Sequence, residues 1–129
     1  EAFKAQNDLV NLALTHIETS IVWWRQGEYE NARGELEIGR KLAATLDNKS
    51  VMAQALLNLG LVARSQNDDK TARALAENSL ILFRELNDKQ NLFIALMDLS
   101  GVESDEGNYA EAKTLLEECL THAREMGDK

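Results

Sequence analysis

The chain repeats itself every forty residues, and this interval limits the possible folds more than any other feature of the sequence. Three four-residue segments that end in Asp or Asn followed by Lys lie forty residues apart: Leu46–Lys49, Leu86–Lys89 and Met126–Lys129. Residues 50–89 align with residues 90–129 without a gap and share twelve identical positions. A period that keeps its register over three units is typical of solenoid proteins, in which each unit packs only against its neighbours.

Each forty-residue unit has the hydrophobic spacing of two helices. In the second unit apolar residues recur every three or four positions, which predicts an amphipathic helix over about 51–66 and another that ends near residue 86. The segment 67–69 separates the two helices, and Asp68 is a candidate N-cap. No segment shows the polar and apolar alternation of a strand, and the chain has no proline. The sequence therefore predicts an all-α fold with six main helices.

Small residues recur in register at the slots where the two helices of a unit would cross. These residues are Ser20, Gly60 and Ser100 on the first helices, and Ala32, Ala72, Ala112, Gly39, Ser79 and Cys119 on the second. Together with the spacings Leu56-x₂-Leu59-Gly60 and Ala72-x₃-Ala76, this pattern resembles the tetratricopeptide repeat (TPR). The resemblance is to the elongated form of about 40 residues found in MalT- and LuxR-related bacterial regulators and in Pins/LGN-type scaffolds.

The resemblance implies a right-handed superhelical α-solenoid of three helix-turn-helix units in one array. The units are residues 10–49, 50–89 and 90–129, and residues 1–9 are expected to be a lead-in helix or the end of a preceding repeat. We expect the array to be a fragment of a longer protein. It stops at a repeat boundary without a polar capping helix, and it has no starting methionine.

Composition argues against several classes of function. The net charge of −8 disfavours nucleic acid and anionic membranes as partners, because both need a surface rich in Lys and Arg. The single cysteine excludes a disulfide framework and CxxC zinc sites, and no glycine-rich phosphate loop is present. His16 and His122 lie far apart in the chain, and Cys119 has no basic group within helical reach. We therefore expect no catalytic residue, no metal and no cofactor, and the chain is predicted not to be an enzyme.

In TPR proteins the first helices of the units line the concave side of the superhelix, so the resemblance implies that a stripe of their side chains faces a groove. The stripe and its acidic neighbours are Leu14, Ile17, Ile21, Trp24, Leu57, Leu61, Arg64, Ile94, Met97, Asp98 and Asp105. These side chains should be free for contact, because they project about 100° away from the core-facing set. We expect an amphipathic helix or an extended apolar segment to bind there, with Lys or Arg toward one end. The alternative is that another helix of the full-length protein covers the stripe, or that the superhelix is tight enough to bury it.

The same resemblance gives the function class. The leading hypothesis is a cytoplasmic protein-interaction or sensor module of a bacterial multidomain signalling or transcriptional regulator. The alternative is an architectural or scaffold segment, including an excised or engineered array, with no ligand of its own. Because Leu115, Leu116 and Leu120 of the last helix have no following unit to cover them, we also expect either self-association through the ends of the array or fraying of that helix.

Overall fold

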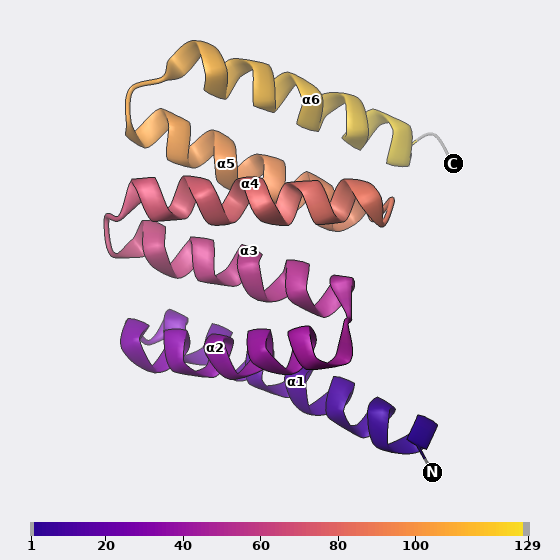
Figure 1. Cartoon of the computed structure of the whole chain (residues 1–129). Helices are drawn as coiled ribbons and strands as arrows, with labels where there is room; N and C mark the ends of the chain where they lie inside the picture. Colours follow the sequence, from indigo (N-terminus) through magenta and orange to yellow (C-terminus); the bar gives the residue numbers. More distant parts are fainter. Residues whose placement is uncertain (1, 128–129) are drawn as a thin grey trace.

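The computed structural model describes residues 2–127, with side chains for residues 4–127, and this part of the chain forms six helices and no strand. The helices are α1 (Ala2–Arg25), α2 (Tyr29–Leu46), α3 (Lys49–Ser65), α4 (Asp69–Glu85), α5 (Lys89–Asp105) and α6 (Tyr109–Gly127). They pack in three pairs, α1 with α2, α3 with α4 and α5 with α6, and the pairs stack one upon the next (Figure 1). This architecture confirms the predicted all-α solenoid of three helix-turn-helix units.

Five turns of the same geometry connect the helices at intervals of twenty residues. Each turn contains one residue with a positive φ, and these residues are Gly27, Asp47, Asn67, Asn87 and Gly107. The residue after it donates its backbone N–H to a carbonyl five positions earlier, as Asp68 does to Ala63 at 2.9 Å. This pattern is a Schellman C-cap, which satisfies the free carbonyls at a helix end. Gly, Asn and Asp occupy the positive-φ positions because they tolerate the left-handed region best.

In the first four turns the residue after the positive-φ residue is the N-cap of the next helix. The side-chain oxygens of Asn48, Asp68 and Asp88 accept hydrogen bonds from the backbone N–H three residues later, at 3.0, 3.2 and 3.2 Å. Each bond satisfies one unpaired donor of a helix N-terminus, so the prediction of Asp68 as an N-cap is confirmed. The hydrogen bonds that Asp68 accepts from Thr71 lower the pKa of its carboxyl. Connections of two or three residues are thus enough to end one helix and start the next.

Small side chains lie where the two helices of a unit cross. Ser20, Ser79 and Ser100 are buried, and each hydroxyl donates to the carbonyl three residues earlier. A Cβ added to Gly60 would lie 3.5 Å from Leu75 Cβ and 3.6 Å from Ala72 O. α3 and α4 therefore approach so closely at Gly60 that a methyl group fits there and a larger side chain does not.

The hydrophobic core runs along the array instead of forming one central mass. One cluster joins α1, α2 and α3 and includes Leu36, which is fully buried. A second cluster joins α3 to α6 around Phe83 and Leu96, which are also fully buried. Each helix hairpin is therefore stabilised by its neighbours, as expected of a solenoid.

The N-terminal segment, residues 1–9, was expected to be either a lead-in helix or the end of a preceding repeat, and the structure does not show the turn that the second of these requires. A preceding second helix would end in a turn near Asn7 and Asp8, in register with the turn at Asp47 and Asn48, but α1 continues through this region without a break. Residues 7–8 are themselves helical, unlike residues 47–48, so they are part of α1. Residue 1 of this segment and residues 128–129 of the third predicted unit lie outside the described part of the chain.

Candidate functional site

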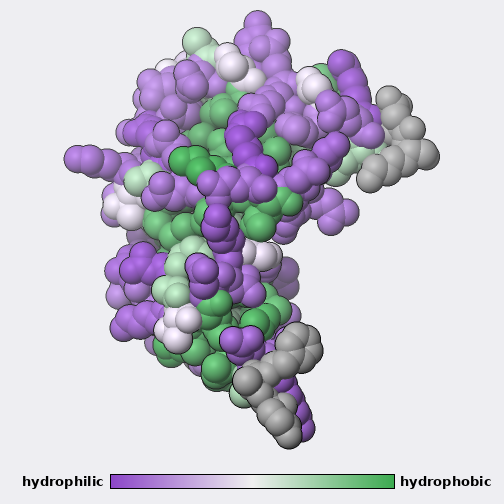
Figure 2. All heavy atoms as spheres, turned by 45° about the vertical axis from the view of Figure 1, so that its right-hand side comes forward, coloured by the Kyte–Doolittle hydropathy of each residue, from purple (hydrophilic) through white to green (hydrophobic). Residues whose placement is uncertain are grey.

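The first helices of the three pairs converge on one side of the molecule. α3 contacts both α1 and α5, whereas within the described residues the second helices α2, α4 and α6 do not contact one another. The side on which the first helices meet is therefore the inner, concave side. Figure 2 shows hydrophobic side chains along the middle of the curved molecule, bordered by hydrophilic ones.

The structure places the predicted stripe at three depths. Ile94, Met97 and Asp105 are exposed, and Leu14, Ile21, Trp24, Leu61 and Arg64 are half-buried. The remaining three, Ile17, Leu57 and Asp98, are between 4 and 5 % exposed.

The expectation that all the stripe side chains are free for contact is wrong for these three buried residues. Ile17 fills the space beside Gly39 of α2, where an added Cβ would lie 3.3 Å from Ile17 Cγ1. Leu57 lies in the cluster around Phe83, and Asp98 lies 3.6 Å from the position of a Cβ on Gly60. Glycine and other small residues on the facing helix bring these side chains into the core, so the exposed stripe is narrower than helical spacing predicted.

An apolar pocket opens between α1 and α3, and we name it the Trp24 niche. Its volume is about 130 Å³, and its walls are formed by Ser20, Ile21, Trp24, Asn58, Leu61 and Val62. Trp24 Nε1 donates a hydrogen bond to Ser65 Oγ at 2.8 Å, which fixes the orientation of the indole ring. Three predicted stripe residues, Ile21, Trp24 and Leu61, therefore come together in one cavity. Asn58 and Ser65 were missed, because only the contact across the two helices identifies them.

The equivalent place between α3 and α5, forty residues later, is filled by the protein itself. Arg64 occupies the register position of Trp24, and its Nε donates to Asp105 Oδ2 at 2.8 Å, as Trp24 donates to Ser65. Its guanidinium also lies 3.7 Å from Asp98 Oδ1 and covers Gly101. The structure thus brings three more stripe residues, Arg64, Asp98 and Asp105, into one charged cluster. We name it the Arg64 cluster.

Asp98 is the buried member of the Arg64 cluster. Neither of its carboxylate oxygens accepts a hydrogen bond within the described part of the chain, because the Arg64 distance is too long for one. Burial raises the pKa of Asp98 to about 6, and the charge of Arg64 only partly opposes this shift. The hydrogen bond to Asp105 raises the pKa of Arg64. The concave side therefore carries an apolar pocket toward its N-terminal end and a charged cluster toward its C-terminal end.

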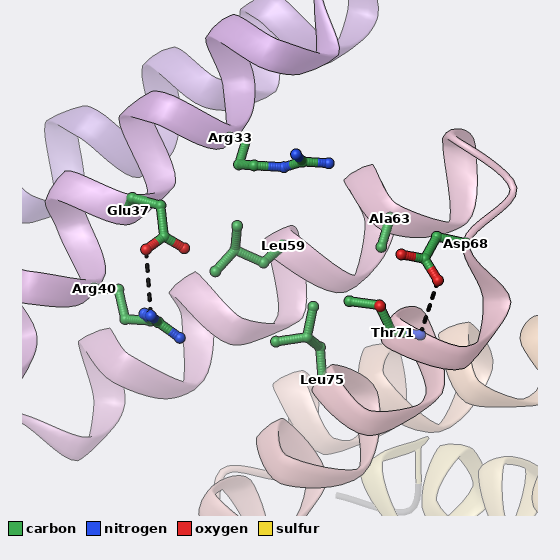
Figure 3. A pocket seen from close by; sticks show the side chains of 8 residues that line it. All are labelled: Arg33, Glu37, Arg40, Leu59, Ala63, Asp68, Thr71 and Leu75. Atoms are coloured by element: carbon green, nitrogen blue, oxygen red, sulfur yellow. Dashed lines mark hydrogen bonds and ion pairs between the residues drawn. The ribbon is translucent and has the colours of Figure 1, made fainter.

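A second, larger pocket lies on the outer side, between α2 and α4 (Figure 3). Its volume is about 330 Å³ and its floor is formed by Leu59, Ala63 and Leu75. Arg40 at its rim pairs with Glu37 at 3.3 Å, so these two charges are paired within the rim. Sequence reasoning missed this pocket, because its walls come from two units and no spacing within one unit indicates it.

Both histidines lie beside carboxylates, and the cysteine is buried. His16 Nδ1 lies 2.6 Å from Glu35 Oε1, and His122 lies 3.6 Å from Glu118 Oε2. Cys119 is buried, and burial raises the pKa of its thiol, which disfavours the reactive thiolate. Among the described residues there is no group of His, Cys, Asp and Glu side chains suited to hold a metal ion. None of the described helices is long and apolar enough to cross a membrane.

A sequence model of the tetratricopeptide repeat matches residues 51–125. This chain belongs to the TPR family. The match covers more than half of the chain, and it includes most of α3, all of α4 and α5, and most of α6. TPR domains are in general protein-interaction modules. No curated protein sequence matches the chain significantly.

Three solved structures show the same fold. The TPR domain of Arabidopsis FLU is 16 % identical, with a TM-score of 0.81 over 92 % of this chain and 98 % of that one. BtubC (BKLC) from P. vanneervenii is 19 % identical, with a TM-score of 0.82 over 91 % of this chain and 48 % of that one. Aspartyl phosphate phosphatase F from Bacillus subtilis is 19 % identical, with a TM-score of 0.84 over 93 % of this chain and 31 % of that one. At these identities the likeness shows the TPR fold alone.

Proposed function

We propose that this TPR array is a protein-binding module that holds an amphipathic helix or an extended apolar segment against its concave side. The observation that carries the proposal is the Trp24 niche. Its walls combine a rigid indole with the aliphatic side chains of Ile21 and Leu61, and the pocket is open in the structure. Buried aromatic residues in such pockets supply much of the binding energy of protein interfaces. An aliphatic or aromatic side chain of the partner would fill the niche.

The other exposed residues of the concave side favour a partner segment that is apolar and has basic residues at one end. Ile94 and Met97 of α5 are 47 and 46 % exposed and extend the apolar surface beyond the niche. Asp105 is exposed beside Arg64, and residues 90–129 contain nine acidic residues and three basic ones. We expect the bound segment to carry Lys or Arg at the end that lies over α5, because opposite charge favours that orientation.

The setting that we propose is a cytoplasmic, non-catalytic segment of a bacterial multidomain signalling or transcriptional regulator. This part of the proposal is supported by the resemblance to elongated TPR arrays in MalT- and LuxR-related proteins. A nucleotide-binding or helix-turn-helix DNA-binding domain in the parent gene would support it. A parent gene that encodes only further TPR units would contradict it and favour an architectural role.

The binding proposal is tested by selection from a display library of random 16-residue peptides. Selected peptides should bind the full chain and lose at least about tenfold in affinity to the Ile21→Lys/Leu61→Lys variant, because a charge in the niche is desolvated on binding. Val22→Lys is the matched control, since Val22 lies on the same helix and is 53 % exposed. Circular dichroism should show the same helicity for all three proteins. Failure to enrich any peptide, or equal binding to both variants, would overturn the proposal.

A further inference from the structure

The outer pocket lies where the first unit meets the second, between α2 and α4 and over α3 (Figure 3). The place forty residues later, where the second unit meets the third, is built from the corresponding helices α4, α5 and α6. Arg33 of α2 and Arg73 of α4 occupy the same register position in these two places. The two arginines differ in their partners, and this difference shows which chemical group the outer pocket lacks.

At the second place, the arginine is bound by two carboxylates. Arg73 Nε donates to Glu103 Oε1 at 2.9 Å, and Arg73 Nη2 donates to Glu106 Oε1. Glu103 is only 9 % exposed, and Arg73 is the cation that pairs with it. A carboxylate withdrawn from water needs such a partner, because burial of an unpaired charge is costly. The array therefore holds a carboxylate between its second and third units.

At the first place, both of these carboxylates are missing. Ala63 occupies the register position of Glu103, and Gln66 occupies that of Glu106. Arg33 donates to the neutral side-chain oxygen of Gln66. The acidic group beside Arg33 is Glu30 of its own helix, 3.4 Å away, and the Glu30 side chain is 76 % exposed, so water weakens this pair. The arginine is present at both places, but at the first a methyl group stands in place of the buried carboxylate.

The resulting pocket has an apolar floor and a cationic edge. Its volume is about 330 Å³. Two of the other charged groups at the rim are engaged within the protein, since Arg40 pairs with Glu37 and Asp68 accepts a hydrogen bond from the backbone N–H of Thr71. In Figure 3 the side chain of Arg33 points from α2 toward the α3 side of the pocket. Its guanidinium is therefore the group best placed to select a ligand.

We propose that the outer pocket binds a small organic carboxylate that has an apolar body. The carboxylate accepts hydrogen bonds from Arg33, as the carboxylate of Glu103 does from Arg73, and the apolar body covers the floor at Ala63. A small molecule suits the pocket better than a protein segment, because the paired charges of the rim offer a larger partner little to bind. The pocket is on the outer side, so this inference does not depend on the Trp24 niche.

The experiment is a titration of the full chain, with ¹³C-labelled Leu and Ala methyl groups, followed by NMR. The probe is 4-phenylbutyrate, and its amide and its amine are probes with the same apolar body but without the negative charge. The methyl signals of Leu59, Ala63 and Leu75 should shift with a Kd of about 1 mM for the carboxylate. The amide should bind at least about fivefold more weakly, because it lacks the charge-assisted hydrogen bonds to Arg33.

Two variants separate the charge of the pocket from its shape. Arg33→Gln should lower the affinity for the carboxylate to that for the amide and leave the affinity for the amide unchanged. Ala63→Glu should weaken binding of the carboxylate at least about tenfold, because it places in the pocket the side chain that residue 103 has in the next unit. Arg124→Gln is the control, since Arg124 is exposed on α6 and its loss changes the net charge as Arg33→Gln does. Thermal melts should show that all three variants are folded.

Several results would overturn the proposal. One is absence of binding, or equal affinity for the carboxylate and the amide. Tighter binding of the amine would show that the acidic side chains of the rim select the ligand instead. Binding that Arg33→Gln leaves unchanged would exclude the guanidinium as the carboxylate site. Shifts confined to the indole N–H of Trp24 would place the probe in the concave niche.

Discussion

Arg64 of α3 lies directly over Gly101 of α5, so close that a Cβ added to Gly101 would lie 2.6 Å from Arg64 Cζ. One unit earlier the corresponding residues are Trp24 and Leu61, and they border an open pocket. The absence of a side chain at residue 101 thus lets the guanidinium occupy the second site and reach Asp98 and Asp105. A single glycine decides which of two equivalent places on the concave side is open.

The contact between Arg64 and Gly101 should be measurable as a coupling energy. In an Arg64→Ala background, Gly101→Ala should stabilise the protein by about 1 kcal/mol, because alanine has the higher helix propensity. In the wild type the new methyl group displaces the guanidinium and should cancel most of that gain. Urea unfolding of the four proteins gives the double-mutant cycle. Additivity within about 0.3 kcal/mol would contradict the contact.

Asp98 should make the protein less stable as the pH rises from about 4 to about 6. The native pKa is about 6 and the ordinary value is 3.8, so between them the native state holds a proton that the unfolded state has lost. Asp98→Asn removes this cost and should stabilise the protein at pH 7.5 by up to about 3 kcal/mol, with little effect at pH 4. Asn58, forty residues earlier, shows that an amide fits this register position.

The control for the Asp98 prediction is Asp105→Asn, which removes the negative charge of an exposed carboxylate that pairs with Arg64. It should not stabilise the protein at pH 7.5. Thermal melts of both variants at several pH values make the comparison. An Asp98→Asn variant with the same pH dependence as the wild type would show that Asp98 ionises normally.

The glycines at the helix crossings should respond differently to substitution. Gly60→Ala should be neutral or stabilising by up to about 1 kcal/mol, because its Cβ would make only ordinary contacts of 3.5 Å or more. Gly39→Ala should be less favourable, since its Cβ would lie 3.3 Å from Ile17 Cγ1 and 3.4 Å from Ala13 O. Gly60→Leu should cost more than about 2 kcal/mol by overpacking. A Gly60→Leu protein that melts with the wild type would refute the close crossing of α3 and α4.

The positive-φ residues of the turns should affect the stability of the protein. Asn87 has a φ of 54°, so Asn87→Gly should stabilise the protein by about 0.5 to 1 kcal/mol. Asn87→Val should destabilise it by about 1 to 3 kcal/mol, because a β-branched residue is strained in this region. Denaturant unfolding measures both effects. Equal stability of the two variants would show that the turn relaxes to another conformation.

The forty-residue period was sufficient to predict the fold, because the same crossing geometry demands a small residue in every unit. Ser20, Gly60 and Ser100 therefore indicated the helix pairs before any contact was known. The first unit resembles the other two less closely in sequence. Its helix α1 begins at Ala2, before residue 10, where the forty-residue register starts the unit. Helix length at the end of an array is not fixed by packing against a neighbour, so the period carries no information about it.

The site could be predicted only in part. Helical spacing identified Ile21, Trp24 and Leu61, which share one niche, but it also placed Ile17 and Leu57 in the groove. A rotation of 100° separates the exposed stripe from the core-facing set on an isolated helix, and a neighbouring helix at close range covers both. The partners of Trp24 and Arg64 lie forty-one residues away, at Ser65 and Asp105. Contacts between units depend on how the hairpins stack, and no local pattern encodes that.

The identical turns at intervals of twenty residues have a consequence for how such a chain can change in evolution. Unequal recombination that removes or inserts forty residues between two corresponding turns, such as Asp47–Asn48 and Asn87–Asp88, joins one Schellman cap to an equivalent N-cap. The new junction has the same backbone geometry as the old one. Repeat number can therefore vary by a single genetic event, whereas the chemistry of the concave side follows from which copy is lost or gained.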